Sequence, residues 1–127
     1  MKTNKFYFSI NISFKQEYDL NKIEELIDLK AYKKINYQDS KGPVPSSKII
    51  FKTDEIENIY TDSVFEEFVL QFGDKFKELQ NILEQNNGSC WFSIVFTNLN
   101  EKPCLSMSNK VLTILSNLGA SYDVDFI

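Results

Sequence analysis

Phe6-Tyr7-Phe8-Ser9-Ile10-Asn11-Ile12-Ser13-Phe14 is the stretch that decides the fold. Its even-numbered residues are all apolar. Its odd-numbered residues are mostly polar: Tyr7, Ser9, Asn11 and Ser13. Successive side chains of a strand point to opposite faces, so this alternation predicts a strand with one buried face and one mostly polar face. Such a strand belongs to a sheet that is covered on one side only.

Apolar spacing, cap residues and turn residues predict the elements that follow this strand. In the first half they are a helix over 20–29 capped by Asp19, a strand over 31–38, a loop over 39–47 and a strand over 48–52. In the second half they are a helical stretch over 63–86 interrupted at Gly73, a buried strand over 90–97, a turn over 98–103, a short antiparallel return over 104–107, a helix over 108–119 and a strand over 121–127.

Particular residues mark the helix ends. Ser63 and Glu66 have the spacing of a capping box, in which the serine caps the helix and the glutamate reaches back. Gly73 and Asp74 can end one helix and start another, so the sequence leaves open whether 63–86 is one kinked helix or two. Ser108 is the expected cap of the last helix, and the glycine at 119 is its expected end.

The predicted order is β-α-β-β-α-β-β-α-β, whose first six elements have the order of a ferredoxin-like unit. We therefore expect a single α+β domain over 1–127 with a mixed, mainly antiparallel sheet and its helices packed on one face. In the last strand, Tyr122, Val124 and Phe126 should face the core. The opposite face of the sheet is then partly open.

Composition excludes several kinds of chemistry. The chain has 127 residues, of which 43% are hydrophobic, and this is enough for one well-packed core. All 14 basic residues are lysines, since the sequence contains neither arginine nor histidine. No site can therefore use an imidazole or a guanidinium group. The four glycines are isolated and show no phosphate-binding spacing, so no cofactor is expected.

The sequence predicts a cytoplasmic protein. Polar residues interrupt the apolar stretch near the N-terminus, unlike the core of a signal peptide. No run approaches the roughly 20 apolar residues that span a bilayer. Cys90 and Cys104 lack zinc spacing, and in the predicted hairpin they lie too far apart for a disulfide. We predict two reduced thiols, with Cys90 acting as a small core residue.

Charge is divided along the chain. Residues 1–53 hold ten lysines and six acidic residues, whereas residues 54–127 hold four lysines and twelve acidic residues. The acidic half disfavours nucleic-acid binding because it repels phosphate backbones. The lysine-rich region over 30–52 leaves a weaker possibility for an anionic partner, and both regions can also be ordinary solvated surfaces that attract each other.

Asp123 and Asp125 are the best candidates for acid–base or metal chemistry, because residues two apart on a strand share a face. The favoured interpretation is that they point to water, since no other ligand type lies close by in the sequence. We therefore expect no metal site and no catalytic residues.

The segment 54–67 has the most functional promise. It interleaves carboxylates with apolar residues and contains no lysine. In this arrangement the charges can steer a basic protein partner and the apolar side chains can supply binding energy, although the apolar residues can equally belong to the core. The candidate partner-binding residues are Asp54, Glu55, Glu57, Tyr60, Asp62, Glu66 and Glu67.

The last 25 residues carry a family resemblance. The segments Pro103-Cys104-Leu105-Ser106-Met107-Ser108, Val111-Leu112-Thr113-Ile114-Leu115-Ser116-Asn117-Leu118-Gly119-Ala120 and Ser121-Tyr122-Asp123-Val124-Asp125-Phe126-Ile127 resemble the end of family 4279 of the bacterial domains of unknown function. The family's frequent tryptophan in a middle strand is replaced by Ile49 to Phe51. The resemblance implies a bacterial, intracellular α+β protein and carries over no catalytic residue.

Our leading hypothesis is a non-catalytic, protein-binding domain. Small acidic proteins often act as immunity proteins beside secreted toxins, so by analogy the partner can be a basic toxin. The alternative is a small-ligand-binding or regulatory domain that uses the open sheet face. An enzyme that relies on Asp123, Asp125 or a buried lysine is the third hypothesis.

Overall fold

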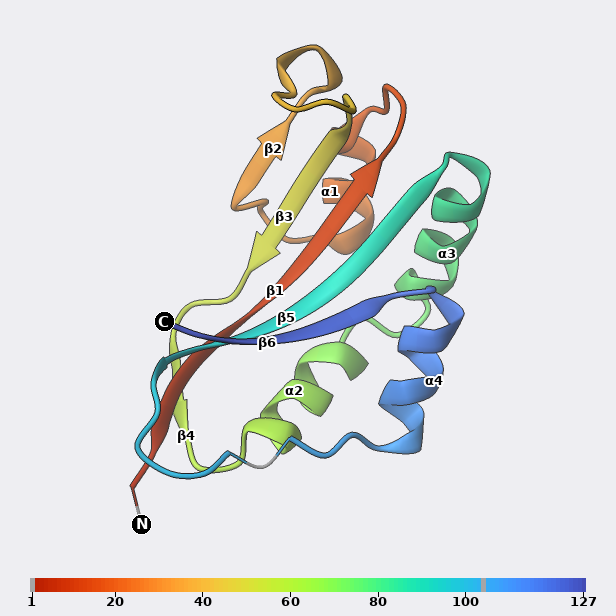
Figure 1. Ribbon diagram of the computed structural model, residues 1–127. Helices are drawn as coiled ribbons and strands as arrows, with labels where there is room; N and C mark the ends of the chain where they lie inside the picture. The colour runs from red at the N-terminus through yellow and green to blue at the C-terminus, as the bar shows by residue number, and fades with distance from the viewer. Residues whose placement is uncertain (1, 104) are drawn as a thin grey trace.

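The computed structural model describes residues 2–103 and 105–127 and shows a twisted sheet with its helices on one side (Figure 1). Six strands and four α-helices lie in this part of the chain. The strands are β1 (Asn4–Phe14), β2 (Lys33–Ile35), β3 (Ser47–Lys52), β4 (Ile56–Asn58), β5 (Gly88–Asn98) and β6 (Ser121–Phe126). The helices are α1 (Leu20–Ile27), α2 (Thr61–Leu70), α3 (Lys75–Gln85) and α4 (Asn109–Asn117).

The sheet has the strand order β2-β3-β1-β5-β6, and β4 pairs with β1 beside β3. Only β5 and β6 pair in parallel; the other pairs are antiparallel. Because β3 lies between β1 and β2, and β1 lies between β3 and β5, the first part is a pair of split β-α-β units, the ferredoxin-like arrangement. The predicted α+β class, with helices on one face of a mixed and mainly antiparallel sheet, is confirmed.

The alternation in β1 places an aromatic core under the helices. All five apolar residues predicted to face inward, Phe6, Phe8, Ile10, Ile12 and Phe14, are at most 1% exposed. Phe65 of α2 reaches this layer, since its ring centroid lies 5.1 Å from that of Phe8 and 6.2 Å from that of Phe92 of β5. The first strand of the sequence therefore becomes the centre of the sheet and of its core.

Several helix ends lie where the sequence places them. The Asp19 side chain accepts a hydrogen bond from the Asn21 backbone N–H at 3.1 Å, and Ser108 Oγ accepts one from the Val111 N–H at 3.3 Å. Gly73 has a φ of 50°, in the left-handed region that favours glycine, and it separates α2 from α3. The open question about 63–86 is thus answered: the stretch forms two helices.

The predicted capping box at Ser63 is wrong. Helix α2 already begins at Thr61, and its N-cap residue Tyr60 makes no side-chain cap bond. The Ser63 N–H instead donates to Asp62 Oδ1 at 2.9 Å. Thr61 is fully buried, so packing of the first turn places the helix start two residues before the apparent capping motif.

The predicted strand over 104–107 is also wrong where the structure describes it. Residues 105–107 are irregular and lead directly into α4, and Cys104 lies outside the described residues. An unpredicted strand, β4, forms instead, where Phe6 of β1 pairs with Ile56. It exists because β1 extends beyond the end of β3 and offers its N-terminal backbone to the chain that follows.

Two strands differ from expectation in extent or burial. The strand expected over 31–38 is reduced to β2, followed by a short 3-10 helix, η1 (Tyr37–Asp39). In β6, Tyr122 and Val124 are half-buried, but Phe126 is 55% exposed although its ring stacks on that of Phe96. Phe126 therefore lies on the predicted face, beside the core residue Phe96, but it is not buried, because β6 is an edge strand whose end is left uncovered.

Candidate functional site

In the described part of the chain, no α-helix covers the sheet face opposite the four α-helices (Figure 1). The pairing registers place one set of alternating side chains from every long strand on it. They are Tyr7, Ser9, Asn11 and Ser13 of β1, Lys48, Ile50 and Lys52 of β3, Trp91, Ser93, Val95 and Thr97 of β5, and Asp123 and Asp125 of β6. We call this surface the open face.

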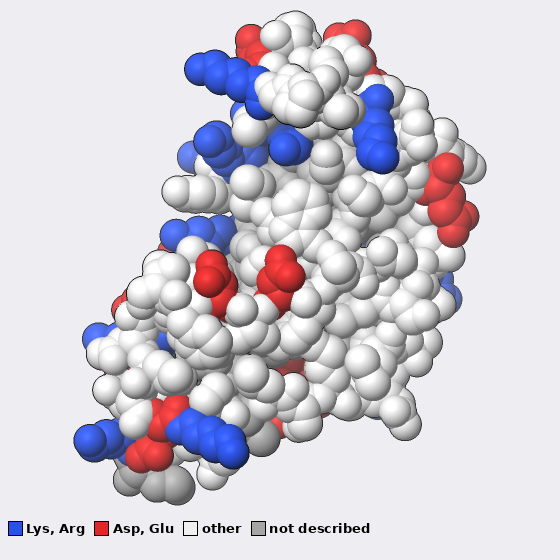
Figure 2. Space-filling model, in the orientation of Figure 1, with Lys and Arg blue, Asp and Glu red and all other residues white. Residues whose placement is uncertain are grey.

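Charges of opposite sign occupy opposite sides of the open face. Lysines gather over β2 and β3, and carboxylates lie over β6 (Figure 2). In the parallel register, Asp123 lies beside Ser93 and Asp125 beside Val95, and both aspartates are exposed. The expectation that these aspartates share a face and point to water is confirmed. Trp91 and Tyr7, both half-buried, lie between the two charged sides.

The structure divides the predicted acidic segment between two surfaces. Glu55 Oε2 accepts a hydrogen bond from Thr97 Oγ1 at 2.6 Å, which holds this carboxylate over β5 on the open face. Glu57 lies beside it along the chain and accepts a hydrogen bond from Thr3 Oγ1 at 2.6 Å. Asp54 and Tyr60 are exposed at the two ends of this stretch.

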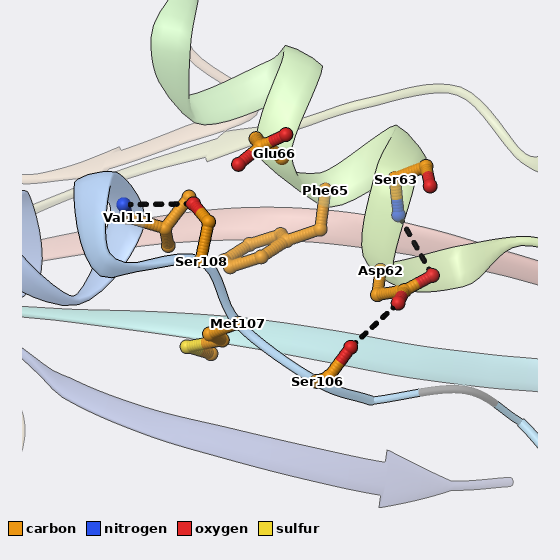
Figure 3. Close-up of a pocket in the computed structure, with 8 residues that line it drawn as sticks. All are labelled: Asp62, Ser63, Phe65, Glu66, Ser106, Met107, Ser108 and Val111. Carbon is orange, nitrogen blue, oxygen red and sulfur yellow. Dashed lines mark hydrogen bonds between the residues drawn. The ribbon is translucent and has the colours of Figure 1, made fainter.

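The remaining acidic residues lie on the helical side. Asp62 and Glu66 line a hollow of about 240 Å³ between α2 and the start of α4 (Figure 3). Ser106 Oγ donates to Asp62 Oδ2 at 2.7 Å, so the carboxylate binds the segment before α4 to the first turn of α2. Glu67 is exposed on α2 and does not line this hollow. The seven predicted residues therefore do not form one continuous site.

A second hollow, of about 340 Å³, lies in the open face itself. The sequence does not predict this hollow, although it draws attention to three of the lining residues: Tyr7, Asp54 and Glu55. Its lining is Tyr7, Tyr32, Lys52, Thr53, Asp54, Glu55 and Thr97. The Lys52 Nζ lies 4.3 Å from the centroid of the Tyr7 ring and 4.9 Å from that of Tyr32, which are cation–π distances. The strand register places Lys52 opposite Ser9 of β1, and a backbone hydrogen bond to Ile50 brings Tyr32 beside β3.

Cys90 is an inert core thiol rather than a reactive group. It is 2% exposed and forms no disulfide, and burial raises its pKa to about 12. Its environment therefore disfavours the thiolate, which is the reactive form of cysteine. The prediction of a reduced, buried Cys90 is confirmed; Cys104 lies outside the described residues.

We expect Cys90 to resist alkylation by iodoacetamide at pH 8 in the folded protein and to react fully in concentrated urea. Alkylation requires an accessible thiolate, whereas Cys90 in the folded protein is buried and its thiol stays protonated. Peptide mapping by mass spectrometry reports on Cys90 separately from Cys104. Labelling of native Cys90 as fast as in urea would contradict the burial described above.

Among the described residues, no group of three or more acidic or cysteine side chains is placed to hold a metal ion. Burial also raises the pKa of Tyr122 to about 12, so its hydroxyl stays protonated at neutral pH.

The open face presents charged groups, aromatic rings and hydroxyl groups. These are features suited to recognition of another molecule.

No described helix is both long enough and apolar enough to cross a bilayer. Neither a curated protein nor a solved structure matches the chain. The model of one protein family, described as a domain of unknown function (DUF4279), matches residues 2–127. This match spans nearly the whole chain and confirms the resemblance found in the last 25 residues, so the chain belongs to the DUF4279 family.

Proposed function

We propose that this protein is a non-catalytic binding domain that recognises a basic protein through its open face. One observation carries the proposal: the four α-helices lie behind the sheet (Figure 1), and the opposite face displays the carboxylates of β6 beside the strand that carries a half-buried tryptophan. Aromatic residues are enriched among those that dominate binding energy at protein interfaces. Trp91 and Tyr7 are the candidates for this role.

Electrostatics supports a basic partner. The chain carries a net charge of −4, and Asp123, Asp125 and Glu55 place negative charge on one side of the open face. A field of this sign speeds the encounter with a positively charged protein. The lysines over β2 and β3 would repel the same partner there, and this repulsion sets how the partner is oriented.

The finer proposal is that the protein works in the bacterial cytoplasm and neutralises a toxin. A toxin that attacks nucleic acid is often basic, and an acidic domain can cover such a surface. This step is an analogy from charge and size, and it predicts a toxin gene beside that of the protein.

The test uses three baits to capture partners from a lysate of the source bacterium: the wild type and two triple variants. The open-face variant carries Glu55→Gln, Asp123→Asn and Asp125→Asn; the helical-face control carries Glu66→Gln, Glu67→Gln and Glu78→Gln. Both remove three negative charges, so they differ only in the surface that is changed. Amide spectra establish that both are folded.

We expect the wild type and the helical-face control to retain the same basic protein, and the open-face variant to bind it at least about fivefold more weakly once it is purified. Binding should also weaken as salt rises from 0.05 to roughly 0.5 M, because salt screens exposed charges. Equal binding by both variants would reject the open face as the acidic docking surface, and the absence of any partner would reject the proposal.

Small-ligand binding is a second candidate function. The observation that favours it is the hollow of about 340 Å³ around Lys52, whose size lies within the range of small-molecule sites. This candidate does not depend on a protein partner.

A further inference from the structure

The hollow around Lys52 holds charges of both signs that do not neutralise each other. Lys52 forms the positive wall of its lining, and Asp54 and Glu55 form the negative wall. In the described part of the chain, the ion pairs are Lys34–Glu24 and Lys77–Asp74, and Lys52 makes none. A lysine only two and three residues away from two carboxylates thus remains unpaired with either of them.

One residue of each charged wall, Lys52 and Glu55, has contacts with neighbouring side chains. Lys52 lies against the rings of Tyr7 and Tyr32, and the Tyr32 backbone N–H is bonded to the Ile50 carbonyl of β3 at 2.8 Å. On the other side, Thr97 Oγ1 donates to Glu55. These contacts engage the Lys52 ammonium and the Glu55 carboxylate separately, with different partners.

Thr53, which lies between the two walls in the sequence, is bonded to β1. The Thr53 N–H donates to the Phe8 carbonyl and its Oγ1 accepts from the Phe8 N–H, both at 3.0 Å. This double contact continues the pairing with β1 by one residue beyond β3. Asp54 and Glu55 follow directly in the chain and line the same hollow as Lys52 without forming an ion pair with it.

We propose that this hollow binds a small zwitterion of the amino-acid type. The ligand's carboxylate would pair with the Lys52 ammonium, and its ammonium would pair with Asp54 and Glu55. Tyr32, a residue that is 66% exposed, offers an aromatic surface for the ligand's side chain. A ligand with only one charge would leave one wall unmatched. The inference rests on the second candidate function and not on protein binding.

The test is a titration of the isotope-labelled full chain with L-phenylalanine, followed by amide NMR. N-acetyl-L-phenylalanine, which lacks the ammonium, and L-phenylalanine amide, which lacks the carboxylate, are the matched ligands. We expect saturable shifts at Thr53, Glu55 and Thr97 with L-phenylalanine, and binding about tenfold weaker for each analogue.

Variants locate the charges that matter. Lys52→Met and Glu55→Gln should each weaken L-phenylalanine binding about tenfold, whereas Lys48→Met, which removes a lysine from the same strand and the same face, should leave it unchanged. The absence of saturable shifts, equal binding of either analogue, or unchanged binding by Lys52→Met would overturn the proposal. The capture experiment leaves Lys52 intact, so protein binding with no amino-acid binding would reject this inference alone.

Discussion

Replacing Phe65 by alanine is expected to lower the free energy of unfolding by about 3 to 5 kcal/mol. The residue is 2% exposed and joins α2 to three strands, because its ring contacts those of Phe8, Phe92 and Tyr122. Removal of the ring leaves a cavity between helix and sheet that fixed strands cannot close. Urea unfolding, followed by Trp91 fluorescence, measures the change.

Leu112→Ala is the matched control for this prediction. Leu112 lies on α4, packs on the same side of the sheet and is 49% exposed. Its truncation should change the free energy of unfolding by no more than about 0.5 kcal/mol, the usual range for surface positions. A loss below roughly 1 kcal/mol for Phe65→Ala would show that the aromatic layer is not the centre of the core.

Replacing Trp91 by alanine is expected to weaken binding of the captured basic partner about thirtyfold, since truncation of a central interface tryptophan removes 2 kcal/mol or more. Trp91 pairs with Asn11 of β1 on one side and with Ser121 of β6 on the other, so it lies on the open face with a strand on each side. Isothermal titration calorimetry with the purified partner measures this effect.

Leu112→Ala again serves as the control, because it removes an exposed apolar residue from the helical side. It should leave the affinity within about twofold of the wild type. A Trp91→Ala protein that is folded and binds the partner as tightly as the wild type would remove Trp91 from the interface. The binding surface would then have to be sought elsewhere.

The sequence predicts the parts of this fold that depend on local patterns. The alternation in β1 sets the inward face because a strand has a period of two, and Asp19 and Ser108 cap their helices by bonds to residues two and three positions away. These features need no knowledge of distant neighbours. The structure confirms them, whereas packing overrules the equally local capping-box motif at Ser63.

The features that sequence reasoning missed depend on distant segments. Strand β4 has three residues and forms because β1 extends beyond β3, which no local pattern reveals. The true start of α2 depends on burial of Thr61, and the exposure of Phe126 depends on which end of β6 the helices leave uncovered. In each case packing decides between two locally acceptable outcomes.

The sequence predicts the acidic composition of the candidate site but not the arrangement of its residues in space. The acidic character of 54–67 is visible in the sequence, but its division between the open face and the α2–α4 hollow follows from the path of the chain after Thr53 and the turn into α2. The pairing of Glu55 with Thr97 joins residues 42 positions apart. The positions of Lys52 and Tyr7 likewise follow from strand register, and that of Tyr32 follows from its backbone hydrogen bond to Ile50.

The most direct test of the open face uses Trp91, which is the only tryptophan in the chain. Protein labelled with 5-fluorotryptophan gives one fluorine NMR signal, and it can be titrated with the unlabelled captured partner. If the open face is the binding surface, this signal shifts or broadens and saturates with the partner at the affinity found by calorimetry. A complex that forms while the signal stays unchanged would contradict the account.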